Sequence, residues 1–396
     1  MLHCLTAVLL WQVLVRLQVR GAFLAGAIFA LHPVCVMSVA WMMELKNTLS
    51  GTLALAASWA YLRFAGLGVY DGGDQAGKNG ARTDWRFYVL SLALFQLALL
   101  AKTAVSFLPV TLLLIVWWQR NRLHRRDIWP FIPMLGLAIV MGQVTSYVER
   151  HSGGASGEEF NIGFLERVLI SGRSFWFYLG KIFFPYRLAF VYPRWHIDTG
   201  AWWQYVYPAA TIGVLGGLWG MRRRIGKGPF AAMLHFYIGT SFLILLLVLY
   251  MTRFSFVSDH WQYFGCMSVI ALVAAGISRV LGRFEKRSPF LKPVLCGVLL
   301  LVLGVLTWRQ CGMYSDLETL WRTTLARNPN SFLANNNLAA LYFGKGRLDE
   351  AITYYRRALE IQPDAPAEDD LGRVFLQKGQ MDEAVAHFEK AMELRP

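Results

Sequence analysis

The C-terminal part of the chain repeats a pattern of small, aromatic and proline residues every 33 positions, so that Asn337-Leu338-Ala339 recurs as Asp370-Leu371-Gly372. The consensus positions of the first copy are Leu338, Gly346, Ala351, Tyr355, Ala358 and Pro363, and those of the second are Leu371, Gly372, Gly379, Ala384, Phe388 and Ala391. Small residues allow two helices to cross closely, and aromatic residues fill the groove between them. The pattern therefore predicts a stack of helical hairpins.

This pattern resembles the tetratricopeptide repeat (TPR), a helix-turn-helix unit of about 34 residues that stacks into a solenoid. We expect a TPR domain over residues 310–396, with a half-unit over 314–330 and repeats over 331–363 and 364–396. TPR grooves bind peptides or proteins, so the predicted partner is a protein or peptide.

Residues 1–309 consist of apolar runs that are separated by short polar loops. A transmembrane helix needs about 20 apolar residues. The candidate spans are 2–17, 21–33, 47–65, 87–101, 103–119, 129–147, 203–221, 230–250, 262–281 and 291–308. The sequence predicts an all-α protein, in which a polytopic bundle of about ten spans over 1–309 precedes the TPR α-solenoid.

One further segment, 164–184, carries Arg167, Arg173 and Lys181 among aromatic residues. This pattern is typical of a helix that lies in the membrane interface. If the segment does not cross the membrane, the basic loops of residues 1–309 all fall on one side by alternation, as the positive-inside rule requires. The TPR domain then lies outside the cytoplasm.

Charge is unevenly distributed between the two parts. Residues 1–309 contain 29 Lys and Arg against 12 Asp and Glu, whereas residues 310–396 contain 10 against 13. The basic excess lies in loops between apolar runs, so it indicates membrane topology rather than nucleic-acid binding. We expect membrane lipids and no nucleic acid among the partners.

The five cysteines predict neither a metal site nor a disulfide framework, because none forms a CxxC pair or another metal-ligand spacing. They are Cys4, Cys35, Cys266, Cys296 and Cys311. A requirement for a divalent metal stays open.

Polar residues gather in the loops that this topology assigns to the outer face. They are His32, Glu44, Lys46, Lys102, Lys181, Tyr192, Arg253, Asp259 and His260. An ionisable group at membrane depth costs at least about 2.5 kcal/mol, so several of them at one face indicate a wet cavity. Cations there would bind an anionic headgroup such as a polyprenyl phosphate, and a carboxylate would act as a general base.

Six of these residues have a structural alternative. His32 and Asp259 could cap helix ends. Glu44 and Lys46 could be solvated charges at the interface. Lys102 could end a helical hairpin and extend to the surface, and Tyr192 could belong to an aromatic belt.

Several motifs in residues 1–309 resemble those of a known protein family. They are Leu31-His32-Pro33-Val34, Ser38-Val39-Ala40-Trp41, Glu44, Lys46-Asn47, Leu99-Leu100-Ala101-Lys102, Tyr178-Leu179-Gly180-Lys181, Tyr192-Pro193 and Asp259-His260-Trp261-Gln262-Tyr263. Together they resemble bacterial multispanning TPR proteins that are related to the transmembrane-and-TPR O-mannosyltransferases, glycosyltransferases of the GT-C class. The resemblance implies a bacterial inner-membrane location, a periplasmic TPR domain and a lipid-phosphate sugar donor.

The resemblance implies that a sugar is transferred from a polyprenyl-phosphate donor to a protein acceptor held by the TPR units. Asp259 and Glu44 would be catalytic, and Lys102, Lys181 and Arg253 would bind the donor phosphate. Relatives carry an acidic pair upstream of the position of Met1, so we expect a chain truncated at both ends or one without catalysis. The alternative function is a noncatalytic membrane-anchored TPR scaffold that recruits envelope proteins.

Overall fold

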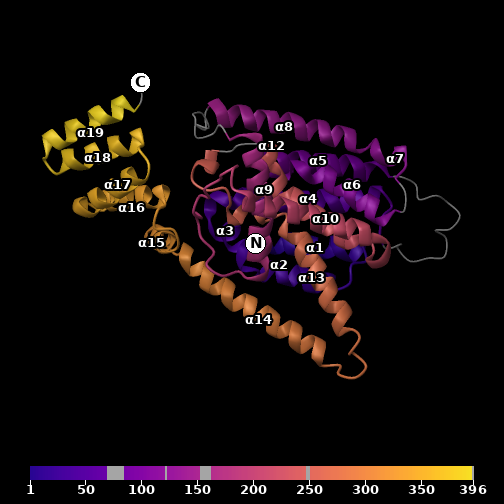
Figure 1. The fold of residues 1–396 in the computed structure, drawn as a ribbon. Coiled ribbons are helices and arrows are strands. Elements are labelled where there is room, and N and C mark those ends of the chain that lie inside the picture. The colour runs from indigo at the N-terminus through magenta and orange to yellow at the C-terminus, as the bar shows by residue number, and fades with distance from the viewer. Residues whose placement is uncertain (69–83, 121–122, 152–161, 247–249, 395–396) are drawn as a thin grey trace. The chain divides into compact units, whose positions relative to one another are not determined.

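The computed structural model describes residues 1–68, 84–120, 123–151, 162–246 and 250–394. These residues form an all-α protein without strands (Figure 1). They divide into two compact units. Unit 1 comprises Met1–Tyr186, Ile197–Tyr250 and Asp259–Trp308, and unit 2 comprises Arg187–His196, Met251–Ser258 and Arg309–Pro396.

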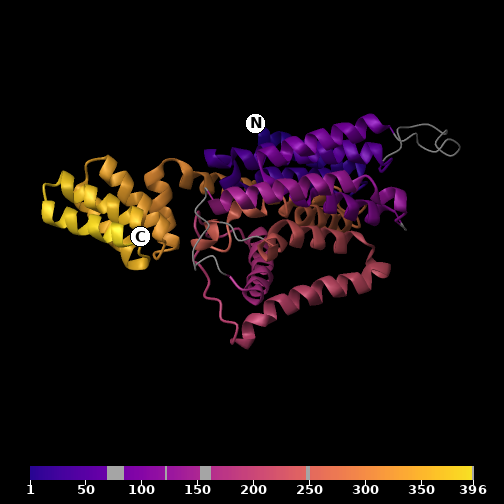
Figure 2. The same cartoon turned by 90° about the horizontal axis from the view of Figure 1, so that it is seen from above.

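Unit 1 is a bundle of helices joined by short 3-10 turns. Its longer helices are α1 (Leu2–Arg16), α2 (Ala22–Leu31), α4 (Leu45–Phe64), α5 (Trp85–Ala101), α6 (Leu108–Gln119), α8 (Phe131–His151), α9 (Phe164–Phe183), α10 (Val206–Ile225), α11 (Gly228–Tyr237), α13 (Cys266–Leu281) and α14 (Leu291–Cys311), of which the last continues into unit 2. The shorter elements are η1 (Pro33–Cys35), α3 (Val36–Ala40), η2 (Met42–Glu44), η3 (Thr103–Phe107), α7 (Arg125–Ile128), η5 (Trp202–Tyr205), a π-helical segment (Ile238–Phe242), α12 (Leu243–Leu246), η7 (Tyr250–Arg253) and η8 (Asp259–Gln262). Figures 1 and 2 show α1, α4, α5 and α8 running roughly side by side.

The centre of unit 1 is the pairing of α4 with α5, and small residues explain how closely these helices pack. Ala57 and Ala60 of α4 are completely buried. The hydroxyl of Ser91 on α5 donates a 2.8 Å hydrogen bond to the carbonyl oxygen of Ala57. On the other side of α4, the hydroxyls of Thr52 and Thr6 of α1 lie 2.9 Å apart. Small side chains allow backbones to approach, and hydroxyls join helices without leaving polar groups unpaired.

The number of membrane spans differs from the sequence prediction. In the described part of the chain, Phe131–Val148 and Leu291–Tyr314 are long and apolar enough to cross a membrane, and Ala22–Leu31 with Pro33–Ala40 forms a third candidate bent by 55°. The expected ten spans are therefore corrected to two or three. Most of the predicted spans do form helices, but α1, α5 and α13 contain only 15, 17 and 16 residues, fewer than the roughly 20 that a bilayer requires.

Helix α14 has an apolar surface that the protein hardly covers. Only 6% of its most apolar stretch of 18 residues is buried, and Leu301 and Trp308 are 68% and 81% exposed. None of the other described helices packs extensively along it. An uncovered helix of this composition is unfavourable in water, because each apolar Å² left in contact with solvent costs roughly 25 cal/mol.

Helix α9 corresponds to the segment predicted to lie in the membrane interface. Leu169, Ile170, Phe175 and Tyr178 are buried, and the ring of Phe175 packs against Phe236 of α11 with the ring centroids 5.4 Å apart. An interfacial location for this amphipathic helix stays a prediction.

Unit 2 contains the repeated helices. They are α15 (Leu317–Arg327), α16 (Phe332–Gly344), α17 (Leu348–Ile361), α18 (Ala365–Gln377) and α19 (Met381–Glu393). The hairpins α16–α17 and α18–α19 each turn at a glycine, Gly346 or Gly379, whose φ of +72° or +79° favours a residue without a side chain. The expected consensus residues Leu338, Ala351, Ala358, Leu371 and Ala384 are completely buried between the helices. Residues 395–396 of the second expected repeat lie outside the described part.

Two segments from the middle of the sequence also belong to unit 2. In residues 187–196, Phe190 packs edge-on against Trp321 at 5.3 Å. In residues 251–258, Phe254 stacks on Phe332, with ring centroids 6.0 Å apart. The helical repeats are thus completed by residues that the sequence analysis assigned to loops of the 1–309 part.

We expect Gly372→Ala to destabilise the repeats, because a Cβ atom there would lie 2.7 Å from the ring of Phe388. The overpacking should cost about 1–3 kcal/mol. Gly344→Ala is the matched control, since a Cβ atom at Gly344 has nothing within 4 Å. Hydrogen exchange of the α16–α19 amides in the full chain should be faster in the Gly372 variant alone. Equal exchange in the two variants would contradict this packing.

Candidate functional site

Four charged or titratable side chains from distant parts of the sequence meet in unit 1. The carboxylate of Glu44 lies 2.9 Å from the ammonium of Lys102, 3.7 Å from that of Lys46 and 3.7 Å from Nε2 of His260. We call Glu44, Lys46, Lys102 and His260 the Glu44 cluster. The side chain of Glu44 is only 9% exposed and that of Lys102 17%, so this is a largely buried ion pair.

Local backbone geometry positions these side chains. Glu44 ends the 3-10 turn η2 and is followed directly by α4, on whose first turn Lys46 lies. Lys102 has an extended backbone with φ −161° between α5 and η3, which breaks the helix there. His260 comes from the 3-10 turn η8. The two turns η2 and η8 and the break between α5 and η3 therefore place the cluster where helices begin or end.

The electrostatic balance of the cluster is positive. Burial lowers the pKa of Lys102, and the neighbouring Glu44 carboxylate opposes this shift. Burial, together with the charges of Lys102 and Lys46, holds the pKa of His260 well below its usual range, so this imidazole is neutral at pH 7. One carboxylate then faces two ammonium groups, and half of the Lys46 side chain is exposed to an incoming anion.

Two buried amide side chains lie in the segments that carry the cluster. Asn47 donates to the hydroxyl of Ser38 at 3.1 Å and to the carbonyl oxygen of His260 at 3.2 Å. Its Oδ1 and both polar atoms of the Gln262 side chain are buried without a hydrogen-bond partner among the described residues. Buried polar groups are nearly always hydrogen-bonded in native proteins. These amides could therefore bind polar groups of a ligand.

The second candidate site is a surface of unit 2, the exposed stripe of two repeat helices that contact each other. The exposed or half-exposed residues of this α16–α18 stripe are Leu333, Asn336, Ala340, Phe343 and Gly344 on α16, and Pro366, Asp369, Arg373, Leu376 and Gln377 on α18. They recur three or four positions apart, which is the period of one helix face. The stripe mixes apolar side chains with amides and a pair of opposite charges, Arg373 and Asp369, 2.7 Å apart.

Residues 330–396 match the tetratricopeptide repeat family. The predicted TPR repeat is thereby confirmed, and a TPR domain indicates protein–protein interaction. The match does not extend to unit 1, and no curated protein matches the chain. The resemblance to GT-C transferases receives no support from these comparisons and stays a prediction.

The structure brings only some of the predicted outer-face residues together. Glu44, Lys46, Lys102 and His260 meet, and Asp259 is buried at the start of η8. His32 caps the turn η1, since its Nδ1 accepts from the amide of Val34. This is the structural role that the sequence analysis left open as an alternative.

Other predicted site residues have separate contacts. The ammonium of Lys181 donates to the carbonyl oxygen of Tyr186 at 2.8 Å. Arg253 belongs to unit 2, where it pairs with Asp364 at 3.1 Å. Tyr192 is buried in the same unit.

Sequence reasoning missed one buried charge network in unit 2. Glu368 is completely buried on α18, and its Oε2 lies 2.7 Å from Nδ1 of His387 on α19. Lys390 lies 2.5 Å from the other oxygen atom. Nothing in the repeat pattern distinguishes Glu368 from an exposed glutamate, so no sequence signal pointed to it.

We expect Lys102→Met to destabilise unit 1 by about 3 kcal/mol, because it leaves the buried Glu44 carboxylate without its closest cation. Lys46→Met should cost less than about 1 kcal/mol, since Lys46 is half exposed. The double variant Glu44→Gln/Lys102→Met should regain most of the loss. Thermal unfolding of the full chain in detergent measures all three. Equal losses for the two single variants would contradict the assignment of Lys102 as the main partner.

Proposed function

We propose that this protein is anchored in a membrane and uses its TPR unit to bind a segment of another protein. The family match over residues 330–396 supports protein binding. The observation that carries the membrane anchor is the uncovered apolar surface of α14, the helix that leads into the repeats. In a membrane, lipid would cover this surface, so its apolar side chains would not be exposed to water.

Charges around α14 support an orientation. Arg283, Lys286 and Arg287 precede the helix, whereas Asp316 and Glu318 follow it. Basic residues next to a span remain on the cytoplasmic side. We therefore assign the TPR unit to the outer side, which is the periplasm in a bacterial inner membrane.

The α16–α18 stripe is the surface that we assign to the bound protein segment. It combines exposed residues of two helices that contact each other, and it contains apolar as well as polar side chains. A segment with alternating apolar and polar side chains would bury Leu333, Phe343 and Leu376 while it retains hydrogen bonds to the amides.

A photo-crosslinking residue placed at Ala340 or Leu376 in the full chain should give discrete protein adducts in cells. The matched controls are Thr353 on α17 and Glu389 on α19, which are also exposed but lie outside the stripe. Ala340→Arg should abolish the adduct formed from position 376, because it fills the stripe with a large charged side chain. Identical adducts from stripe and control positions would reject this surface.

A second candidate function is glycosyl transfer at the Glu44 cluster from a polyprenyl-phosphate donor, and one observation favours it. Two ammonium groups face a single buried carboxylate, and Asn47 and Gln262 have buried polar atoms without a hydrogen-bond partner among the described residues, an arrangement that suits a phosphate group. Because Lys102 holds Glu44, we assign Glu44 to positioning the cations and Asp259 to accepting the proton of the acceptor hydroxyl. Lys181 stays in the proposal as a further phosphate ligand, whereas Arg253 belongs to unit 2 and is not part of this site.

In this reaction the acceptor oxygen bonds to the anomeric carbon of the sugar, while the bond from that carbon to the lipid phosphate breaks. The hydroxyl proton passes to Asp259, and the released phosphate stays paired with Lys46 and Lys102. The TPR unit would supply the acceptor protein.

Asp259→Asn should then lower sugar transfer about 100-fold or more, the usual contribution of a general base. Membranes that contain the full chain are given radiolabelled polyprenyl-phosphate mannose or glucose, and label in protein is counted. Asp382→Asn, an exposed change on α19, is the control. If the unsubstituted chain transfers neither sugar above empty membranes, the protein is a scaffold without catalysis.

A further inference from the structure

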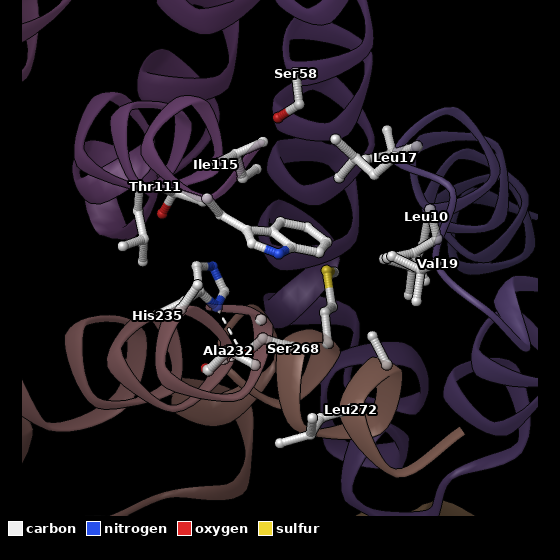
Figure 3. Close-up of a pocket in the computed structure, with 18 of the residues that line it drawn as sticks. Leu10, Leu17, Val19, Ser58, Thr111, Ile115, Ala232, His235, Ser268 and Leu272 are labelled. Atoms are coloured by element: carbon white, nitrogen blue, oxygen red, sulfur yellow. Dashed lines mark hydrogen bonds between the residues drawn. The ribbon is translucent and has the colours of Figure 1, made fainter. Parts of the chain in front are cut away.

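Unit 1 contains a cavity of about 560 Å³ that the Glu44 cluster does not line (Figure 3). Side chains from α1, α4, α6, α11 and α13 form its walls. Figure 3 shows Leu10 of α1 and Leu17, which directly follows α1, on one side and Thr111 and Ile115 of α6 on another. Along α13 the lining extends from Met267 to Arg279, a length of roughly 18 Å at the helical rise per residue.

The walls of this cavity are effectively apolar. The hydroxyl of Ser58 donates to the carbonyl oxygen of Ala54, and that of Thr111 to Phe107, so neither offers a free donor to a ligand. Nδ1 of His235 lies 2.9 Å from the hydroxyl of Ser268, and Figure 3 shows this pair at the wall. A hydrocarbon chain fits such a lining, whereas a polar ligand would lose hydrogen bonds there.

One end of the cavity is cationic. Arg20 and Arg279 both line it, and the described lining contains no carboxylate. Gly21 brings these arginines together, because its backbone is so close to α13 that a Cβ atom would lie 2.6 Å from the carbonyl oxygen of Ala274. Within the described part of the chain, neither arginine forms an ion pair. An anion at this end would be attracted by both cationic side chains.

We propose that this cavity binds one anionic phospholipid from the membrane. An acyl chain occupies the apolar space between α6 and α13, and the phosphate lies at Arg20 and Arg279. Guanidinium groups bind phosphate oxygens through paired, charge-assisted hydrogen bonds. The proposal rests on the membrane location proposed above, but it concerns a separate site and needs neither the TPR partner nor glycosyl transfer.

The test uses the full chain, delipidated in mild detergent and titrated with dioleoyl phosphatidylglycerol or dioleoyl phosphatidylcholine. Native mass spectrometry counts the lipids that remain bound. We expect one phosphatidylglycerol per chain, and weaker retention of phosphatidylcholine. Arg20→Gln/Arg279→Gln should weaken phosphatidylglycerol binding about tenfold or more, the effect of losing charged hydrogen bonds. Ala232→Trp, which fills the cavity, should reduce retention of both lipids.

Arg287→Gln is the matched control, because Arg287 is equally exposed but does not line the cavity. Phosphatidylglycerol binding that is unchanged in the double arginine variant would overturn the proposal, as would equal retention of the two lipids. Glycerol phosphate should not displace the lipid, and displacement would assign the site to a free phosphate instead. Carbonate extraction of cell membranes tests the membrane anchor separately, so failure of one proposal is distinguishable from failure of the other.

Discussion

The pairing of Glu44 with Lys102 is the interaction on which the arrangement of unit 1 most depends. Taking a carboxylate out of water is expensive unless a cation and hydrogen bonds compensate it. Here the compensation fixes the start of α4 against the end of α5, the two helices at the centre of the bundle. One turn later, Asn47 holds the same helix to Ser38 and to the η8 turn. The charged pair and the hydrogen bonds of Asn47 thus join four separate segments of the chain.

The positions of the helices could be predicted from the sequence, because apolar runs bounded by polar residues mark them clearly. The run at 47–65 corresponds to α4 over Leu45–Phe64, and that at 87–101 to α5 over Trp85–Ala101. The number of spans could not be predicted. An apolar run of 10 to 17 residues is compatible with a buried helix as well as with a membrane helix. Only three-dimensional packing separates α14, which is uncovered, from α13, which is partly buried.

The candidate site was predictable only in part. Loop charges such as Lys46 and Lys102 are recognisable between apolar runs, and the predicted topology assigned them to one membrane face. The role of His32 depends on the direction of its ring nitrogens, which no sequence pattern encodes. The residues that line the cavity could not be predicted from the sequence for another reason. Leu10, Thr111 and Leu272 have the same helical spacing as ordinary core residues. A cavity between helices does not change this spacing, so the sequence does not reveal it.

Unit 2 is assembled from three stretches of chain that are far apart in sequence. The segments around Phe190 and Phe254 pack against Trp321 and Phe332 of the C-terminal helices. During synthesis these segments emerge more than a hundred and about eighty residues before those partners. Contacts that close such long loops form late and slow down folding. The contacts of Phe190 and Phe254 with Trp321 and Phe332 can therefore form only after the C-terminal helices have been synthesised.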